Sequence, residues 1–168
     1  VDEGIDTGDI IFQNIYEISE DDDYNSILNR AYEYCADCLE KAVMQIYSGQ
    51  VKRIKQSTIH PTGFYCGGRE MGDELINWDQ PSAKIFSFVR ALNQPAGPGA
   101  KSYINGEEVI INKVKINENA PFFEGIPGQV IGKEKDNLFV KTKDSWISLV
   151  NYVSKRRIRI GDRLSRNE

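Results

Sequence analysis

The sequence lacks any long hydrophobic run. Its apolar stretches are short pieces such as residues 10–12 and 109–111, whereas a membrane-spanning helix needs roughly 18 or more consecutive apolar residues. No secretory signal is recognisable either. The sequence therefore predicts no transmembrane helix and no membrane partner.

Cysteine and histidine are also scarce. Three cysteines, an odd number, argue against a disulfide framework and predict a reducing, cytoplasmic location. Cys35 and Cys38 have C-x-x-C spacing in the middle of an expected helix, Cys66 is isolated, and zinc needs about four ligands. We expect the pair to pack in a core and predict no metal site. The single histidine, His60, precedes a proline and is expected at the surface or in a capping role.

The remaining composition is that of a globular protein. The 168 residues are 40% hydrophobic, 10% aromatic and 27% charged, enough for one domain or two small ones. Charge is uneven, because residues 1–100 carry 8 Lys/Arg and 16 Asp/Glu, whereas residues 101–168 carry 13 and 9. The basic excess gathers near the C-terminus, where it can contact phosphates or form a solvated face. Its members are Lys155, Arg156, Arg157, Arg159, Arg163 and Arg166.

The first half alternates strand-like and helical patterns. Residues 9–18 are rich in β-branched and aromatic residues and predict a strand. Apolar residues spaced by three and four predict a helix over roughly 23–48, capped by acidic residues at its start and by Gly49, with one stripe facing a core. Residues 50–77 show no period and predict a long ordered loop, of a length that is often functional.

The second half begins with a shorter helix and continues as strands. A helix starting near residues 79–82 ends before the Pro/Gly-rich run 93–99, which we interpret as a boundary. Turns such as Asn105-Gly106 and Asp136-Asn137 separate the following strand candidates. Five short strands indicate a small barrel or sandwich. The candidates are residues 101–104, 109–116, 128–133, 138–142 and 146–150.

Two loops carry candidate chemistry. Asp6 lies between Gly4 and Gly8, where a tight turn could lift its carboxylate into a cleft for proton transfer; the alternative is an ordinary turn aspartate. Arg69 follows two glycines, which suits bidentate contact with a carboxylate or phosphate; the alternative is a salt bridge with Glu70 or Asp73.

The order of several short motifs resembles one enzyme family. The motifs are Gly-Ile-Asp-Thr-Gly-Asp-Ile-Ile (4–11), Ile-x-x-Gly (46–49), Tyr65 with Arg69, Ile-Asn-Trp (76–78), Phe-Val-Arg-Ala-Leu (88–92) and Pro-Gly-Ala (98–100). In this order they are similar to the C-terminal portion of the 10-formyltetrahydrofolate-dependent formyltransferases. That family includes methionyl-tRNA and sugar-nucleotide N-formyltransferases, and the resemblance covers essentially the whole chain.

The resemblance implies roles for the first loop. Asp6 would match the catalytic aspartate, acting with a histidine and an asparagine from an N-terminal Rossmann-like half that this chain does not contain. Gly4, Ile5 and Gly8 would bind the cosubstrate 10-formyltetrahydrofolate. The chain also begins without methionine, so we expect a fragment that is inactive by itself.

The resemblance also bears on the amine acceptor. Tyr65 and Arg69 are similar to the arginine-bearing loop of the nucleotide-sugar enzymes, which favours a small amino-sugar substrate, although Asn77 departs from the usual Asp or Glu. The basic C-terminal part favours initiator Met-tRNA instead. A third alternative is a non-catalytic OB-type binding or dimerisation module, and a homodimer is a further expectation.

The expected fold is α/β. Residues 1–78 would form the tail end of a Rossmann-like formyltransferase domain, and residues 79–168 a helix with a small OB-like β-barrel.

Overall fold

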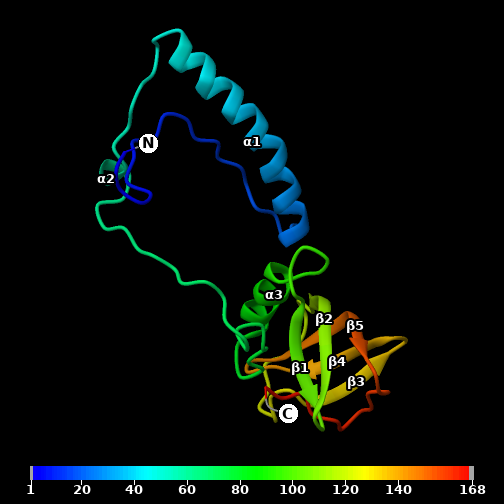
Figure 1. Ribbon diagram of the computed structural model, residues 1–168. Helices are drawn as coiled ribbons and strands as arrows, with labels where there is room; N and C mark the ends of the chain where they lie inside the picture. Colours follow the sequence, from blue (N-terminus) through cyan, green and yellow to red (C-terminus); the bar gives the residue numbers. More distant parts are fainter. Residues whose placement is uncertain (1, 167–168) are drawn as a thin grey trace. The chain divides into compact units, whose positions relative to one another are not determined.

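The computed structural model describes residues 2–166 and divides them into two compact units (Figure 1). The first unit holds the residues up to Glu20 and Ile27–Arg69; the second holds Asp21–Ser26 and the chain from Glu70 onward. The functional domain boundary predicted between residues 78 and 79 stays a prediction. Within residues 2–166, no helix is long and apolar enough to cross a membrane.

The second unit is built on a five-stranded antiparallel sheet, which confirms the five predicted strands. Its strand order is β1-β2-β5-β4-β3, so two edge strands flank three central ones (Figure 1). The strands are β1 (Ala100–Ile104), β2 (Glu107–Ile116), β3 (Val130–Glu134), β4 (Asn137–Lys141) and β5 (Trp146–Ser154).

Two tight turns set the register of the hairpins. Asn105 and Gly106 have φ angles of 49° and 80°, the left-handed values that a two-residue β1–β2 turn requires. The predicted second turn was wrong by one residue. Lys135, with φ of 54°, and Asp136 form it, and Asn137 already pairs with Glu134 as the first residue of β4.

One face of the sheet and helix α3 (Ser82–Ala91) form the core. Alternate β1 side chains are buried, as period-two strand geometry requires, and α3 packs against β2 and β5. Ile85 and Val89, four residues apart, are the apolar side chains of α3 buried in this core.

The run 93–99 after α3 is a turn inside this unit rather than the predicted boundary. Gly97 and Gly99 donate backbone hydrogen bonds to the carbonyl oxygens of Asn93 and Leu92, and the whole run lies within the second unit.

A C-terminal segment, residues 161–165, reaches both edges of the sheet. At one end the Val130 N–H donates to the Asp162 carbonyl (2.8 Å), and at the other Tyr103 and Ser165 exchange two backbone hydrogen bonds of 2.9 Å.

The helices and the five strands together confirm the expected mixed α/β architecture with a small antiparallel sheet. Closure of the sheet into a barrel stays a prediction.

The first unit contains helix α1 (Tyr24–Tyr47) from Ile27 onward, and the short helix α2 (Gln56–Ile59). The predicted helix over 23–48 is confirmed. Asp23 caps it, since its carboxylate accepts from the Ser26 N–H (3.0 Å) and the Ser26 hydroxyl accepts from the Asp23 N–H (3.0 Å). Residues 50–69 are otherwise irregular, as expected.

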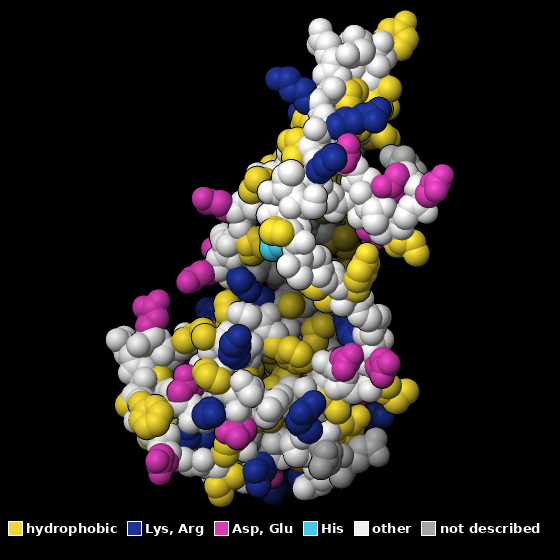
Figure 2. All heavy atoms as spheres, turned by 90° about the vertical axis from the view of Figure 1, so that its left-hand side faces the viewer, with side chains coloured by type: hydrophobic (Ala, Val, Ile, Leu, Met, Phe, Trp, Pro, Cys, Tyr) yellow, Lys and Arg dark blue, Asp and Glu magenta, His cyan; other side chains and the backbone are white. Residues whose placement is uncertain are grey.

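Two expectations about this unit were wrong. Residues 9–18 form an irregular segment instead of a strand, with one isolated bridge between Ile10 and Ile54. A lone strand without neighbours leaves its backbone groups unpaired, so an extended ladder is not formed here. The stripe on α1 faces no core, because α1 has no buried side chain. Figure 2 shows hydrophobic side chains at the surface, and Leu39, Val43 and Ile46 are all more than half exposed.

The cysteines do not pack in a core either. Cys35 is exposed and Cys38 is half-buried, and both are free thiols, as is the exposed Cys66. The reason is the same as for the apolar stripe: the helix on which Cys35 and Cys38 lie buries none of its side chains.

Asp144 fixes the start of α3 and gives a pH-dependent prediction. Burial alone would raise the pKa of its carboxyl, but hydrogen bonds from the Ser82 N–H and from the Thr142 and Ser82 hydroxyls hold the pKa below the ordinary value of 3.8. The folded state thus binds this proton more weakly than the unfolded state, so the carboxylate stabilises the fold above pH 3.8 and loses its effect as pH falls through its lower folded pKa.

We expect Asp144→Ala to reduce the free energy of unfolding by about 2 kcal/mol at neutral pH. The deficit should shrink as the pH falls below 3.8, which urea titrations across that range would measure. Asp79→Ala is the control, since Asp79 is an exposed carboxylate just before the same helix. A deficit that stays constant down to the lowest pH would contradict this role.

Candidate functional site

The loop around Asp6 is a tight turn closed by its own side chains. Asp6 has a φ of 55°, in the left-handed region that Asp and Asn adopt more readily than most residues. The Thr7 hydroxyl and the Gly4 N–H both donate to the Asp2 carboxylate, and the bond from Thr7 is the main cause that lowers the pKa of Asp2. A Cβ at Gly4 would lie 2.2 Å from the Thr7 hydroxyl oxygen. The turn therefore needs glycine at position 4.

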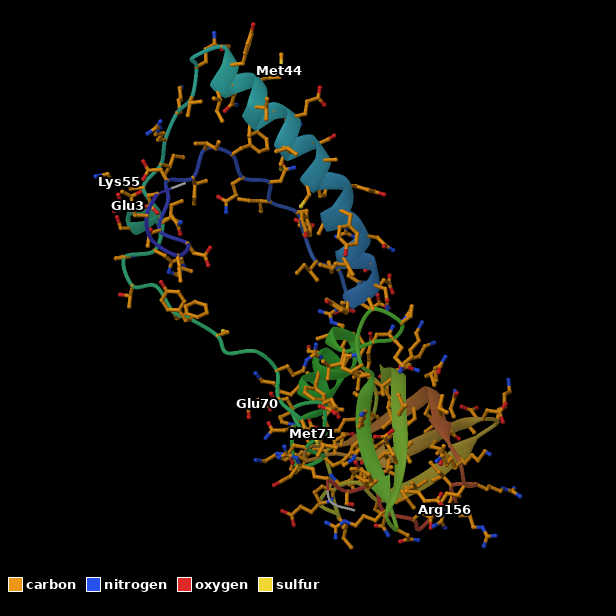
Figure 3. The ribbon with its side chains drawn as sticks, viewed as in Figure 1. Glu3, Met44, Lys55, Glu70, Met71 and Arg156 are labelled. Atoms are coloured by element: carbon orange, nitrogen blue, oxygen red, sulfur yellow. The ribbon has the colours of Figure 1, made fainter. Side chains whose placement is uncertain are left out.

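Gln56 ties this turn to α2. Its side-chain amide donates to the carbonyl oxygens of Asp6 (2.9 Å) and Gly8 (2.8 Å). Just beyond, Ile10 and Ile54 exchange two backbone hydrogen bonds of 2.8 and 2.9 Å. Figure 3 labels Glu3 of the turn and Lys55, which immediately precedes α2, in the same part of the first unit. Gln56, the first residue of α2, and Ile54 just before the helix thus support the glycine loop. Nothing in the sequence pattern indicated this role for Gln56.

The hydrogen bonds leave the carboxylate of Asp6 available. The main chain of the turn is held at Asp6 and Gly8, whereas the Asp6 side chain is exposed and Ile5 is 81% exposed. A carboxylate on a fixed backbone can accept a hydrogen bond or a proton from a ligand without reorganising the loop. The turn geometry is confirmed; the roles of Asp6 in catalysis and of Gly4, Ile5 and Gly8 in folate binding stay predictions.

Tyr65 and Arg69 do not join this loop. Both are exposed, Tyr65 to 80% of its surface. Over residues 2–166, no hydrogen bond or ion pair connects either side chain to Asp6. The structure therefore groups Gly4, Ile5, Asp6 and Gly8, and leaves the substrate role of Tyr65 and Arg69 as a prediction.

The described residues contain no cluster of side chains that could bind a metal ion. Among residues 2–166, no three His, Cys, Asp or Glu side chains lie close enough to hold a metal ion. His60 is exposed, and its backbone N–H donates to Gln56 as it ends α2. The predicted surface location of this histidine is confirmed.

The Ile-Asn-Trp motif serves the fold. Ile76 and Trp78 are buried, and the Trp78 indole N–H donates to the Ser102 hydroxyl (3.0 Å). The Ile76 N–H also donates to the Lys101 carbonyl, so the motif is bound to the edge strand β1. Asn77 between them is exposed, and its side-chain oxygen accepts from the Asp79 N–H (3.1 Å). This part of the resemblance therefore reflects packing.

Curated relatives carry names that refer to formyl transfer or to 10-formyltetrahydrofolate. The chain is 31% identical over 151 residues to methionyl-tRNA formyltransferase of Syntrophomonas wolfei, covering 89% of this chain and 46% of the relative. It is 32% identical over 142 residues to cytosolic 10-formyltetrahydrofolate dehydrogenase of Xenopus laevis, covering 84% of this chain and 15% of the relative. The chain thus spans less than half the length of these relatives.

A solved structure shares the fold. The sugar 3N-formyl transferase WlaRD, crystallised in the presence of dTDP and 5-N-formyl-THF, superposes with a TM-score of 0.61 at 22% identity, over 94% of this chain and 53% of that one.

Most of the second unit matches a known protein family. Residues 70–165 match the profile described as formyl transferase, C-terminal domain. The match begins where the second unit resumes at Glu70 and includes α3 and all five strands. Because it takes in more than half of the chain, the chain belongs to the formyl transferase family, whose C-terminal domain it contains.

Proposed function

We propose that this chain is part of an enzyme that transfers the formyl group of 10-formyltetrahydrofolate to a primary amine. The family match over residues 70–165 carries this proposal. In the reaction, the amine nitrogen attacks the formyl carbon, the new C–N bond forms, and tetrahydrofolate leaves as that carbon's bond to the folate nitrogen breaks. The attacking amine must lose a proton and the departing folate nitrogen must gain one, and the exposed carboxylate of Asp6 is suited to accept the proton from the amine and return it to the leaving nitrogen.

The proposed acceptor is a nucleotide-linked amino sugar. Arg69 follows Gly67 and Gly68, and all three residues are exposed. A guanidinium in that setting can approach a sugar-nucleotide diphosphate and bind it through two parallel hydrogen bonds. Tyr65, four residues earlier and equally exposed, offers a ring that can cover the sugar or the base.

Initiator Met-tRNA is the second candidate acceptor. It is supported by the name of a relative that covers 89% of this chain and by the excess of positive charge over residues 101–168. Backbone phosphates of RNA bind basic surfaces, and such binding weakens steeply with salt.

The discriminating experiment is an acceptor screen with the full-length enzyme. Release of tetrahydrofolate would be followed with a panel of nucleotide-linked amino sugars and with charged initiator Met-tRNA. We expect turnover with a sugar. Turnover with Met-tRNA alone would establish the second candidate, and no turnover with any amine would refute formyl transfer.

Arg69→Ala tests the acceptor loop in the same assay. We expect kcat/KM for the sugar nucleotide to fall roughly 10- to 100-fold, because charge-assisted hydrogen bonds contribute about 1.5–3 kcal/mol. Arg69→Lys should recover only part of this loss, since an ammonium cannot make the two parallel bonds. Arg53→Ala is the matched control, as Arg53 is an exposed arginine of the same unit. Unchanged kcat/KM in Arg69→Ala would remove Arg69 from the site.

A further inference from the structure

A polar pocket opens in the second unit where the β3–β4 hairpin lies beside the end of β5. Its cavity volume is about 430 Å³, within the range of small-ligand sites. The polar and charged residues that line it come from three places in the chain: Lys133, Asp136, Asn151, Tyr152, Ser154, Arg156 and Arg157. The pocket thus gathers side chains that the sequence separates by more than twenty positions.

The backbone that carries the two arginines is held at both ends. The Ser154 hydroxyl donates to the Arg156 carbonyl (2.9 Å) and accepts from the Arg156 N–H (3.4 Å). Two residues further on, Ile158 is 5% exposed and belongs to the hydrophobic core. Arg156 and Arg157 therefore leave the end of β5 on a fixed turn, and Figure 3 shows Arg156 at the outer side of this unit.

The opposite wall is also anchored. Tyr152 packs against the core, and its hydroxyl donates to the Asp136 carbonyl at 3.5 Å. This contact joins β5 to the β3–β4 turn, next to Lys133, which pairs with Leu138 in the hairpin. The lining is therefore built on paired strands and a core contact, which keep a pocket shaped before a ligand arrives.

The lining of the pocket carries more positive than negative charge. Lys133, Arg156 and Arg157 form no ion pair with any carboxylate in the described part of the chain. Lys101 on β1 shows the contrast, because Glu74 and Glu108 hold its ammonium at 3.3 and 3.2 Å. Asp136 is the one carboxylate in the lining. Three unpaired cations around one cavity favour an anion with several oxygen atoms.

We propose that this pocket binds a phosphoryl group. The guanidinium groups of Arg156 and Arg157 would bind its oxygens, with the Lys133 ammonium from the facing hairpin adding charge. The group belongs to a free nucleotide, because a small phosphate ligand can fill a cavity of this size. An RNA backbone presents the same chemistry and is the alternative outcome of the test. As a nucleotide site, the pocket goes beyond formyl transfer and does not depend on which amine is the acceptor.

The test is an NMR titration of the 168-residue chain with inorganic pyrophosphate. We expect saturable shifts of backbone amide signals over residues 133–136 and 150–158. Arg156→Gln and Arg157→Gln should each weaken binding roughly tenfold, as expected for loss of one charge-assisted contact. Arg159→Gln is the matched control, because it removes the same charge from an exposed residue outside the pocket lining.

Two further probes distinguish the source of the phosphoryl group. Tighter binding of a nucleoside diphosphate than of pyrophosphate indicates a free nucleotide. Tighter binding of an oligoadenylate, with affinity falling linearly on a log–log plot against salt, would overturn the nucleotide site and assign these cations to RNA contact. The proposal is overturned if pyrophosphate produces no saturable shifts at millimolar concentration, or if Arg159→Gln weakens binding as much as Arg156→Gln and Arg157→Gln do.

Discussion

Asp6→Asn in the full-length enzyme is expected to lower kcat by about 10²- to 10⁴-fold, the usual contribution of a positioned acid or base. The amide has the same size as the carboxylate but cannot accept a proton from the attacking amine. The turn itself should survive, because asparagine also tolerates the left-handed φ of 55° and Gln56 binds the Asp6 carbonyl rather than its side chain. The measurement is the rate of tetrahydrofolate release at saturating substrates.

Two controls make this result specific. Asp9→Asn removes an exposed carboxylate three residues away and should leave kcat close to that of the unmodified enzyme. A thermal melt of Asp6→Asn should match the parent protein, which would separate loss of chemistry from loss of fold. Near-normal turnover in Asp6→Asn would refute the catalytic role of Asp6 while leaving the family relationship intact.

Local sequence patterns were sufficient to predict most of the elements. The apolar spacing of α1 and the turns that separate the five strands each reflect local backbone geometry, so both can be recognised without knowing the partner surface. The predicted β3–β4 turn was misplaced because Lys135 adopts a left-handed φ, a conformation that glycine, asparagine and aspartate adopt more readily than lysine. Residues 9–18 have the composition of a strand but pair with no strand among the described residues. Composition alone cannot predict whether a partner strand is present.

The candidate site was less predictable because its supports are distant in sequence. Gln56 holds the carbonyls of Asp6 and Gly8 across about fifty residues, and a single glutamine at the start of a four-residue helix has no pattern that identifies its partner. The resemblance was informative for a different reason. Ile76 and Trp78, which carry part of it, are core residues, so their spacing is fixed by packing whatever the acceptor is. The family could therefore be recognised, whereas the acceptor could not.

Gly128→Ala is expected to reduce the free energy of unfolding of the second unit by about 3 to 4 kcal/mol, within the tail of strongly destabilising single substitutions. Gly128 has a φ of 83°, and a Cβ there would lie 2.1 Å from the Leu164 carbonyl oxygen. Its N–H donates to Lys141 and its carbonyl accepts from Leu164, both at 2.8 Å. The backbone is thus held from both sides and cannot move away from the clash without losing a hydrogen bond.

Gly106→Ala separates this clash from backbone strain. Gly106 has nearly the same φ, 80°, but a Cβ there would meet no atom within 4 Å, so we expect a loss of about 1 kcal/mol from conformation alone. Urea unfolding followed by tryptophan fluorescence reports this unit, because Trp78 and Trp146 both lie in it. The difference between the losses of unfolding free energy in Gly128→Ala and Gly106→Ala measures how firmly the segment 161–165 is bound to the start of β3. Equal losses would mean that this segment yields readily and does not hold the edge of the sheet.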